Sequence, residues 1–506
     1  MTNDLADVYG GGASFNPSIF AALEQGLIRS RDEPAVVVRH QSAGHLSDIV
    51  PNGNAKPNDC LRWTFDQLHR GAVRVAQGLV DAGVRPGSTI VTFTSNSAEW
   101  LLLLWALALA KIGISSLDSG SLNSARKGEL ASYLTGVKPS TIILADEQHV
   151  GWLDQVLKER NLDCKVRVLF QSPKGTAPGW TTLAQMCAPY SEAIDKSLSE
   201  SARTDNPNRI AFISYTSGTS SGKPKGCPRT AECMVVAILN QTYQKPDRTK
   251  PVRMLLHTAN FRVIAPLMAF RAWCTGSCAV MPGPGFESRT VLDTIEQERV
   301  TNSLFIPAQI HALAADPMVG GRDLRSLELL IGSGDMITRA LVEKGRRVFP
   351  NAGWLTGHGM TEGGGFFKWD FWEREDELPY HGDISTLGRV NSGTRIRIVQ
   401  DGSTVKTGET GELQVQGSGV ISGYMSGTHA DSWFTDDQGT WFRTGDLGMI
   451  DKDGYVYILG RLKDIIIRAA VNLIPAAIES CLQSYTGSQV CSKPHSFYLT
   501  SMLTTV

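Results

Sequence analysis

Hydrophobic and polar positions along the first half of the chain alternate between a helical period and short apolar runs. Val73, Val75, Ala76 and Leu79 predict a helix that starts near Phe65 and leads into a buried strand at 90–93. The longest apolar run, 100–110, lies inside a predicted helix over 98–112. It has about half of the ~20 residues that a membrane span requires, so we expect a buried helix.

The same rhythm continues with predicted strands at 114–117, 141–144, 252–257, 278–280, 303–306 and 327–331, and predicted helices at 124–135, 230–241, 264–275, 287–298, 308–315 and 338–348. Such alternation is typical of parallel sheets covered by helices. The Ser-, Asp- and Asn-rich segment 188–208 predicts a loop. After Gly388 the pattern changes to short alternating runs at 395–399, 412–416 and 455–458, which predict an antiparallel sheet or barrel.

Composition adds limits rather than a function. The chain has 506 residues, of which 42% are hydrophobic and 20% charged, with a formal net charge of −1. These values are typical of a soluble globular protein and show no bias toward nucleic acid or anionic membranes. The nine cysteines lack metal-ligand spacing, which favours buried thiols in a reducing compartment. With no signal at Met1–Leu5 and no peroxisomal tripeptide at Thr504–Val506, we expect a cytoplasmic location.

A loop rich in glycine and hydroxyl groups follows the apolar run 210–213 and reads Ser214-Tyr215-Thr216-Ser217-Gly218-Thr219-Ser220-Ser221-Gly222-Lys223-Pro224-Lys225-Gly226. Glycines allow backbone N–H groups to converge, and hydroxyls and lysines add donors and charge, so the loop predicts a phosphate cradle. It is not a Walker A loop, because three residues separate Gly218 and Gly222 and Pro224 follows Lys223. The alternative is a Ser/Gly surface linker.

At these residues the sequence resembles the adenylate-forming superfamily: acyl-CoA synthetases, luciferases and peptide-synthetase adenylation domains. Three later segments also resemble its motifs: Gly357-His358-Gly359-Met360-Thr361-Glu362-Gly363-Gly364-Gly365, Thr444-Gly445-Asp446 and Gly460-Arg461-Leu462-Lys463-Asp464. The order and spacing of these matches are more specific than any one of them. Each segment also has an ordinary alternative: a glycine-rich turn for 357–365, a common turn for 444–446 and an exposed charged turn for 460–464. Taken singly, the second is a weak signal and the third favours the charged turn.

The resemblance implies an α/β fold with two helix-covered, mostly parallel sheets, a smaller distorted antiparallel β-barrel and a truncated C-terminal subdomain. We expect a large AMP-binding part over 1–463, divided at about 60–200, 205–385 and 386–463, and a remnant of a mobile C-terminal domain over 464–506.

The resemblance also assigns roles. Thr216, Lys225 and Glu362 would be catalytic, with Glu362 as the Mg²⁺ ligand. ATP or AMP would contact Thr216, Ser217, Gly218, Thr219, Ser220, Ser221, Gly222, Lys223, Gly334, Gly357, His358, Gly359, Met360, Thr361, Glu362, Asp446 and Arg461. Asp446 and Arg461 would hold the ribose, and Asp464 would be the hinge. The acyl pocket would be lined by Phe261, Ser333, Gly363 and Gly364, whose glycines suggest room for an acyl or aryl chain.

The chain departs from the family pattern near its end. Only about 40 residues follow Asp464, near the size below which a unit rarely builds its own core. They contain no counterpart of the lysine motif that members of the family aim at the carboxylate and the α-phosphate. We therefore expect ATP binding with slow adenylation or none, because losing such a charge can cost orders of magnitude in rate.

The preferred function is an ATP- and Mg²⁺-dependent ligase that joins a fatty, aryl or polyketide-type acid to CoA. The alternatives are an adenylation enzyme that loads the phosphopantetheine thiol of an acyl carrier protein, and a nucleotide-binding pseudoenzyme. Neither a nucleic acid partner nor a membrane span is expected.

Overall fold

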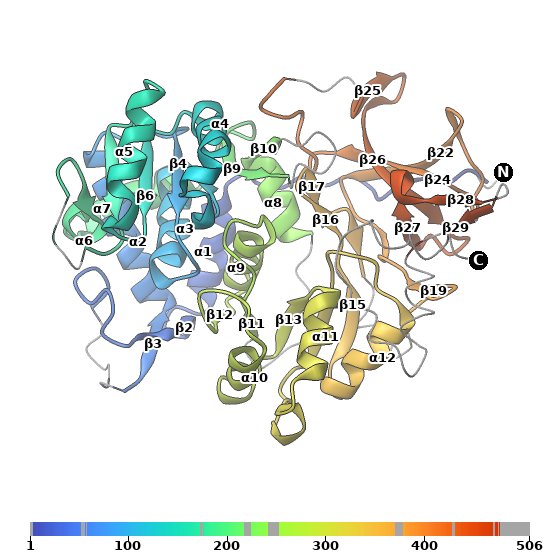
Figure 1. The fold of residues 1–506 in the computed structure, drawn as a ribbon, viewed down its shortest axis with the longest axis horizontal. Helices are drawn as coiled ribbons and strands as arrows, with labels where there is room; N and C mark the ends of the chain where they lie inside the picture. The colour runs from blue at the N-terminus through green and yellow to red at the C-terminus, as the bar shows by residue number, and fades with distance from the viewer. Residues whose placement is uncertain are drawn as a thin grey trace.

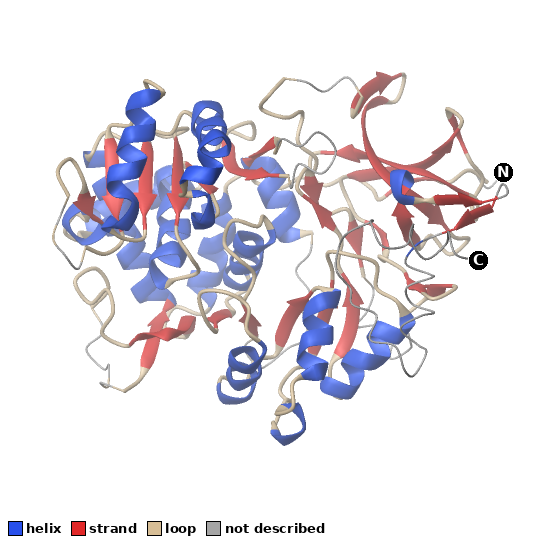
Figure 2. Cartoon of the chain, in the orientation of Figure 1, coloured by secondary structure: helices blue, strands red, loops and turns tan. Residues whose placement is uncertain are grey.

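Three seven-stranded sheets organise the chain (Figure 1). The computed structural model describes residues 4–51, 56, 58–172, 175, 177–216, 224–240, 252–369, 378–427, 431–468, 471–473 and 475. Helices lie on and between two of the sheets, whereas the third, on the right of Figure 2, consists almost entirely of strands.

The first sheet has the order β10-β9-β5-β4-β6-β7-β8 and is parallel except for the antiparallel pair β9–β10. Its strands are β4 (Thr89–Phe93), β5 (Gly113–Ser116), β6 (Thr141–Leu144), β7 (Val166–Leu169), β8 (Thr181–Thr182), β9 (Ile210–Tyr215) and β10 (Gly226–Thr230). The β9–β10 pair carries the start and the end of the predicted phosphate loop.

The second sheet has the order β15-β14-β13-β11-β12-β2-β3 and is parallel from β15 to β2. Its strands are β2 (Pro34–Ser42), β3 (Cys60–Thr64), β11 (Arg253–Leu255), β12 (Cys278–Met281), β13 (Asn302–Phe305), β14 (Leu329–Gly332) and β15 (Gly353–Thr356). The N-terminal strands β2 and β3 thus extend a sheet whose other strands come after residue 250.

Helices form three layers around these two sheets, as the membership of the buried clusters shows. Between the sheets lie α1 (Ile19–Arg29), α2 (Phe65–Asp81), α3 (Ala98–Ala110), α8 (Ala231–Leu239) and α9 (Ile264–Cys274). The outer face of the first sheet carries α4 (Lys127–Val137) and α5 (Val150–Glu159), and that of the second carries α10 (Ser288–Gln297), α11 (Pro307–Ala315) and α12 (Arg339–Val348).

Local chemistry explains where the central helices begin. The Thr64 and Gln67 side chains form a capping box at the start of α2, and Ser97 caps α3. Every residue of α3 is buried, as the apolar run predicted. The prediction of a loop over 188–208 was wrong in part, because helix α7 (Glu192–Ala202) forms there after the N-cap Ser191. Only Ser199 and Ala202 of that helix are fully buried, so its apolar period is weak.

The third sheet follows the path β1-β22-β24-β26-β25, with β23 beside β22 and β27 beside β26. Within the described residues this path has two ends, so the predicted barrel is an open antiparallel sheet. Its strands are β1 (Asp7–Tyr9), β22 (Thr394–Gln400), β23 (Ser403–Thr404), β24 (Thr410–Gly417), β25 (Trp433–Asp436), β26 (Gly439–Ile450) and β27 (Val456–Arg461).

The remaining elements are short: α6 (Leu183–Met186), β16 (Gly359–Met360), β17 (Gly363–Gly364), β18 (Phe367–Lys368), β19 (Tyr380–His381), β20 (Ile384–Ser385), β21 (Arg389–Val390), β28 (Ile466–Arg468), β29 (Val471–Leu473) and the 3-10 turns η1 (Ser119–Ser121), η2 (Ser124–Arg126), η3 (Glu147–His149), η4 (Val319–Gly321) and η6 (Leu462–Asp464). In the part of the chain that the structure describes, no helix is long and apolar enough to cross a membrane. The described cysteines are free thiols; five of them are buried as predicted, and Cys60 and Cys187 are partly exposed.

Candidate active site

The two ends of the predicted phosphate loop meet at the open end of the β9–β10 pair. The Thr216 backbone N–H donates to the Lys225 carbonyl at 3.0 Å, and the Lys225 N–H donates to Thr216 Oγ1 at 3.1 Å. This closure fixes two of the three predicted catalytic residues, Thr216 and Lys225, at the neck of the loop, where its two ends meet. Ser217, Gly218, Thr219, Ser220, Ser221, Gly222 and Lys223 lie outside the described residues.

Lys225 and Glu362 meet through a tyrosine. The Tyr424 hydroxyl donates to Glu362 Oε1 at 2.6 Å, and the Lys225 ammonium lies 4.9 Å from the centre of the Tyr424 ring. Burial and the neighbouring Glu362 carboxylate raise the pKa of Tyr424 above its usual range. The phenol therefore stays protonated and can donate to the carboxylate.

A buried arginine supports the backbone just before Glu362. Arg229, on β10, is 1% exposed and donates from Nε to the Thr361 carbonyl at 3.3 Å and from Nη2 to the Met360 carbonyl. The Ile421 N–H donates to the Glu362 carbonyl at 2.8 Å. The β16–β17 hairpin that carries Glu362 is thereby joined both to the phosphate-loop strand and to the segment before β25.

Asp446 and Arg461 face each other across the β26–β27 ladder. Arg461 Nη1 lies 3.0 Å from Asp446 Oδ1 and donates to the Thr444 carbonyl at 3.0 Å, while the Asp446 N–H donates to Thr444 Oγ1 at 3.0 Å. The Asp446 side chain is 5% exposed and that of Arg461 is 52% exposed. The Asp446 carboxylate is therefore buried, while the Arg461 side chain that pairs with it reaches the surface.

Electrostatics connect this pair to the glycine-rich segment. Burial, together with the negative charges of Glu362 and Glu412, raises the pKa of Asp446 to about 6. Arg461 and Thr444 lower that pKa but do not cancel the effect of burial. Burial lowers the pKa of His358 to about 4, and the positive charge of Arg461 lowers it in the same direction. Glu362 and Asp446, and likewise His358 and Arg461, are thus close enough for one charge to act on the other.

The sequence-predicted residues therefore fall into two groups. Glu362, His358, Asp446 and Arg461 interact directly or through their charges around the β16–β17 hairpin and the β26–β27 ladder, and Lys225 is linked to Glu362 through Tyr424. The second group lies at the carboxyl ends of parallel strands in the second sheet, where ligands of open α/β sheets commonly bind. There the Gly357 N–H donates to the Gly332 carbonyl at 2.8 Å, and the Ser333 N–H donates to the Phe305 carbonyl at 3.1 Å.

Several of the predicted glycines are explained by close packing. A Cβ atom on Gly363 would lie 2.7 Å from the Gly419 carbonyl oxygen and 2.6 Å from the Phe366 ring, so the space on this side is filled. Gly334 has φ = +87°, and its Cβ would lie 2.8 Å from Ile306. Gly364 is less crowded, since its nearest neighbour would be Arg229 Nη1 at 4.0 Å.

Phe261 and Asp464 lie apart from these contacts. Phe261 is half-buried in the connection from β11 to α9, with the Arg262 guanidinium 5.3 Å from its ring centre. Asp464 is exposed at the end of η6. Residues 476–506, which carry the expectation of slow adenylation, lie outside the described residues.

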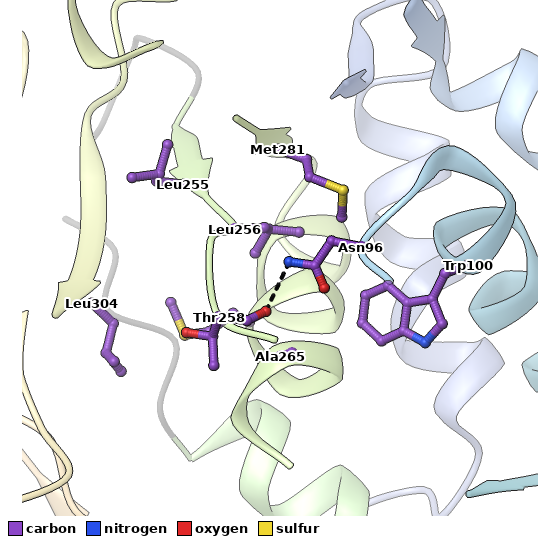
Figure 3. Close-up of a pocket in the computed structure, with 9 residues that line it drawn as sticks. Asn96, Trp100, Leu255, Leu256, Thr258, Ala265, Met281 and Leu304 are labelled. Atoms are coloured by element: carbon purple, nitrogen blue, oxygen red, sulfur yellow. Dashed lines mark hydrogen bonds between the residues drawn. The ribbon is translucent and has the colours of Figure 1, made fainter. Parts of the chain in front are cut away.

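A small cavity lies between the start of α3 and the second sheet with its helix α9 (Figure 3). It is lined by Asn96, Trp100, Leu255, Leu256, Thr258, Ala265, Met268, Met281 and Leu304. Asn96 Nδ2 donates to the Thr258 carbonyl at 3.0 Å and joins the two sides of the cavity. The cavity has room for about one water molecule and is too small for an acyl chain.

A magnesium ion fits this site only with help from a ligand. Within the described ranges, no three His, Cys, Asp or Glu side chains are grouped to hold a metal by themselves. Mg²⁺ usually binds through one or two carboxylates together with phosphate oxygens and waters. The partly exposed Glu362 carboxylate, beside the neck of the phosphate loop, matches that donor set.

Two residues of this region had no role in the predicted site. Tyr424 received no role, because its contact with Glu362 joins positions 62 residues apart. Arg229 follows the phosphate loop in Gly226-Cys227-Pro228-Arg229-Thr230. A charged residue within a buried strand beside a binding loop usually has a specific partner, and this pattern could have indicated a role for Arg229.

Comparison with known proteins identifies the family. The family model described as "AMP-binding enzyme" matches residues 38–425. The chain belongs to the AMP-binding enzyme family. An acyl-CoA ligase from Pestalotiopsis microspora is 31% identical over 97% of this chain and 87% of its own length. A feruloyl-CoA synthase from an Amycolatopsis species is 26% identical over 88% of this chain and 82% of its own.

The fold agrees with membership of the AMP-binding enzyme family. The structure of a luciferase-like enzyme from the mealworm Zophobas morio superposes with a TM-score of 0.71 at 22% identity, over 91% of this chain and all of that one. The resemblance inferred from the motifs is therefore confirmed, together with the expectation that the protein is an enzyme of this family.

Proposed function

We propose that this AMP-binding enzyme is an ATP-dependent ligase that joins an aryl-substituted carboxylic acid to CoA by way of an acyl adenylate. The observation that carries the proposal is the convergence of Lys225, Glu362, Asp446 and Arg461 from four separate segments of the chain. The names of the acyl-CoA ligase and feruloyl-CoA synthase relatives support the reaction, and the second supports an aromatic acid.

The residues divide the work on ATP by charge. The carboxylate of Asp446 can accept hydrogen bonds from both ribose hydroxyls, and Arg461 beside it can donate to the ribose or the α-phosphate. Lys225 and Thr216 at the loop neck would meet the triphosphate. Glu362 would hold Mg²⁺, which neutralises charge on the leaving phosphates when bound.

The first step needs positioning and charge neutralisation more than it needs a general base. A carboxylate oxygen of the acid attacks the α-phosphorus, the new O–P bond forms, and the bond to the β-phosphate oxygen breaks to release pyrophosphate. In the second step the CoA thiol loses its proton, its sulfur attacks the acyl carbon, and the bond to AMP breaks. The products are a thioester and AMP.

The test uses the full chain with ATP, Mg²⁺, CoA and a panel of hydroxycinnamic, benzoic and medium-chain fatty acids. Acid-dependent pyrophosphate release and the thioester product are measured separately, the second by mass spectrometry. We expect both with an aryl acid, and their loss in Asp446→Ala and Glu362→Ala variants that keep the wild-type melting temperature.

The acceptor is tested in the same assay by replacing CoA with a phosphopantetheinylated carrier protein. Thioester on the carrier but not on CoA would overturn the assignment of CoA. Tight binding of a non-hydrolysable acyl-AMP mimic without any acid-dependent pyrophosphate release would overturn the ligase and favour a nucleotide-binding protein that has lost catalysis.

A further inference from the structure

The side chain of Glu362 is held from outside the nucleotide motifs. Tyr424 donates to its Oε1 at 2.6 Å and is itself 8% exposed. The Trp433 ring packs edge-on against the Tyr424 ring, with centroids 5.1 Å apart, and Trp433 Nε1 donates to the Ile421 carbonyl at 3.1 Å. Tyr424 therefore has little freedom to turn away from the carboxylate.

The backbone that carries Glu362 is held separately. Arg229 binds the carbonyls of Met360 and Thr361, the two residues before it. A fully buried guanidinium is costly, because its charge leaves water. The buried Arg229 guanidinium donates to the carbonyl oxygens of Met360 and Thr361. These hydrogen bonds stabilise a single backbone conformation just before Glu362.

These contacts matter most if Glu362 binds a metal. A carboxylate that rotates freely must be ordered when the ion binds, and that cost weakens binding. Groups that hydrogen-bond a metal ligand and fix its orientation remove the cost, and losing one typically weakens metal binding 10- to 100-fold. Tyr424 and Arg229 are arranged to do this, one at the carboxylate and one at the peptide.

We propose that Tyr424 and Arg229 are positioning residues that fix Glu362 for Mg²⁺, Tyr424 through the carboxylate oxygen and Arg229 through the backbone of residues 360–361. The inference rests on the proposed function, because it takes Glu362 as the metal ligand. Neither side chain takes part in the chemistry itself.

The test measures metal binding rather than turnover. Mn²⁺ is titrated, by electron paramagnetic resonance, into the full chain saturated with α,β-methylene-ATP, which cannot be cleaved between its α- and β-phosphates. We expect Tyr424→Phe to weaken Mn²⁺ binding about 10-fold or more and to leave analogue binding in EDTA within about 2-fold. Tyr457→Phe is the matched control, since the Tyr457 hydroxyl donates to the Asp451 carboxylate at 3.1 Å. It should change neither.

Arg229→Met is measured in the same way beside Arg271→Met. Arg271 is also buried and donates to a backbone carbonyl, that of Ala237, at 2.8 and 3.2 Å, so it controls for the loss of any buried arginine. We expect weaker Mn²⁺ binding only in the Arg229 variant. If both arginine variants unfold, Tyr424→Phe alone decides the proposal.

A double-mutant cycle separates positioning from a general structural role. In a Glu362→Ala background there is no carboxylate to position, so Tyr424→Phe should have no further effect on Mn²⁺ binding. An equal loss in both backgrounds would overturn the inference, as would unchanged Mn²⁺ affinity in Tyr424→Phe. Unchanged Mn²⁺ affinity in Glu362→Ala itself would instead overturn the metal role of Glu362 in the proposed function.

Discussion

Two buried carboxylates in different parts of the molecule have opposite pKa shifts. Glu99, at the start of α3, has a side chain that is 1% exposed, and Asp446, on β26, one that is 5% exposed. Burial alone would raise both pKa values. Hydrogen bonds from His45 (2.7 Å), Gln41 (2.9 Å) and Gln171 (3.1 Å) lower the pKa of Glu99 to about 2, whereas the pKa of Asp446 is raised to about 6.

The Glu99 and Asp446 sites differ in the groups that donate hydrogen bonds to the carboxylate. At Glu99 the fold supplies them, and the network joins α3 to the segments before β3 and after β7. At Asp446 the fold supplies Arg461 and the Thr444 hydroxyl, but it also places the negative charges of Glu362 and Glu412 nearby. A buried carboxylate whose charge the fold leaves poorly stabilised is typical of a ligand site, and ribose hydroxyls would provide the missing donors.

The largest expected effect is at Glu99. Glu99→Ala removes a buried carboxylate that accepts three hydrogen bonds from partly exposed donors. A hydrogen bond to a charged group typically contributes about 1.5–3 kcal/mol, so, with the exposure of the donors discounted, we expect the free energy of unfolding to fall by about 3–5 kcal/mol. Urea denaturation followed by circular dichroism measures it. A loss below about 1 kcal/mol would mean that the network is not structural and would erase the contrast with Asp446.

At Asp446 the expected change has the opposite sign. The folded pKa lies above the ordinary value of 3.8, so this group's contribution to stability is fully present below about pH 4, falls as pH rises to about 6 and stays low above it. Asp446→Asn should therefore raise the free energy of unfolding at pH 7.5 by up to about 3 kcal/mol. The same variant should bind the acyl-AMP mimic more weakly.

The matching control is the pH dependence of the difference in free energy of unfolding between the wild type and Asp446→Asn. The difference should shrink at pH 4.5, where wild-type Asp446 is protonated. A difference that does not depend on pH would show that the carboxylate is not destabilised by its surroundings.

A smaller effect concerns ligand binding. With a pKa of about 6, roughly a tenth of Asp446 is ionised at pH 5, so binding of the acyl-AMP mimic should weaken about 10-fold between pH 7 and pH 5. Isothermal titration calorimetry at both values measures this, and Asp446→Asn, which cannot ionise, corrects for titration of the ligand. Equal pH dependence in the two proteins would argue against a role for the ionised carboxylate.

The smallest effect is expected at an exposed pair. Lys127 and Glu159 lie 2.6 Å apart, but their side chains are 36% and 41% exposed. Glu159→Ala should leave the free energy of unfolding unchanged within the error of urea denaturation, because water screens the pair. A loss as large as that of Glu99→Ala would show that pairing, and not burial, governs these carboxylates.

The sequence predicted the parts of the fold that depend on local pattern. The apolar run of α3 and the strand–helix rhythm from β4 to α12 follow from residue periodicity, which the structure confirms. Helix α7 was missed because its buried face is small, and no prediction covered helix α5 or strand β7. That β2 and β3 join the second sheet depends on packing between distant segments, which no local pattern encodes.

The same limit applies to the candidate site. Asp446 and Arg461 were both proposed from motifs, but their pairing depends on the register between β26 and β27. The contact of Tyr424 with Glu362 and the burial of Arg229 depend on how the β16–β17 hairpin packs against β10 and residues 417–424. These contacts could be found only once the segments were placed in space.

A crystal structure of the full chain with Mg²⁺ and a non-hydrolysable acyl-AMP mimic tests the central claim most directly. We predict both ribose hydroxyls within about 3 Å of the Asp446 carboxylate, with Arg461 beside them and the phosphate mimic facing Lys225 and Glu362. Adenosine bound in a different place, away from Asp446 and Glu362, would contradict the account.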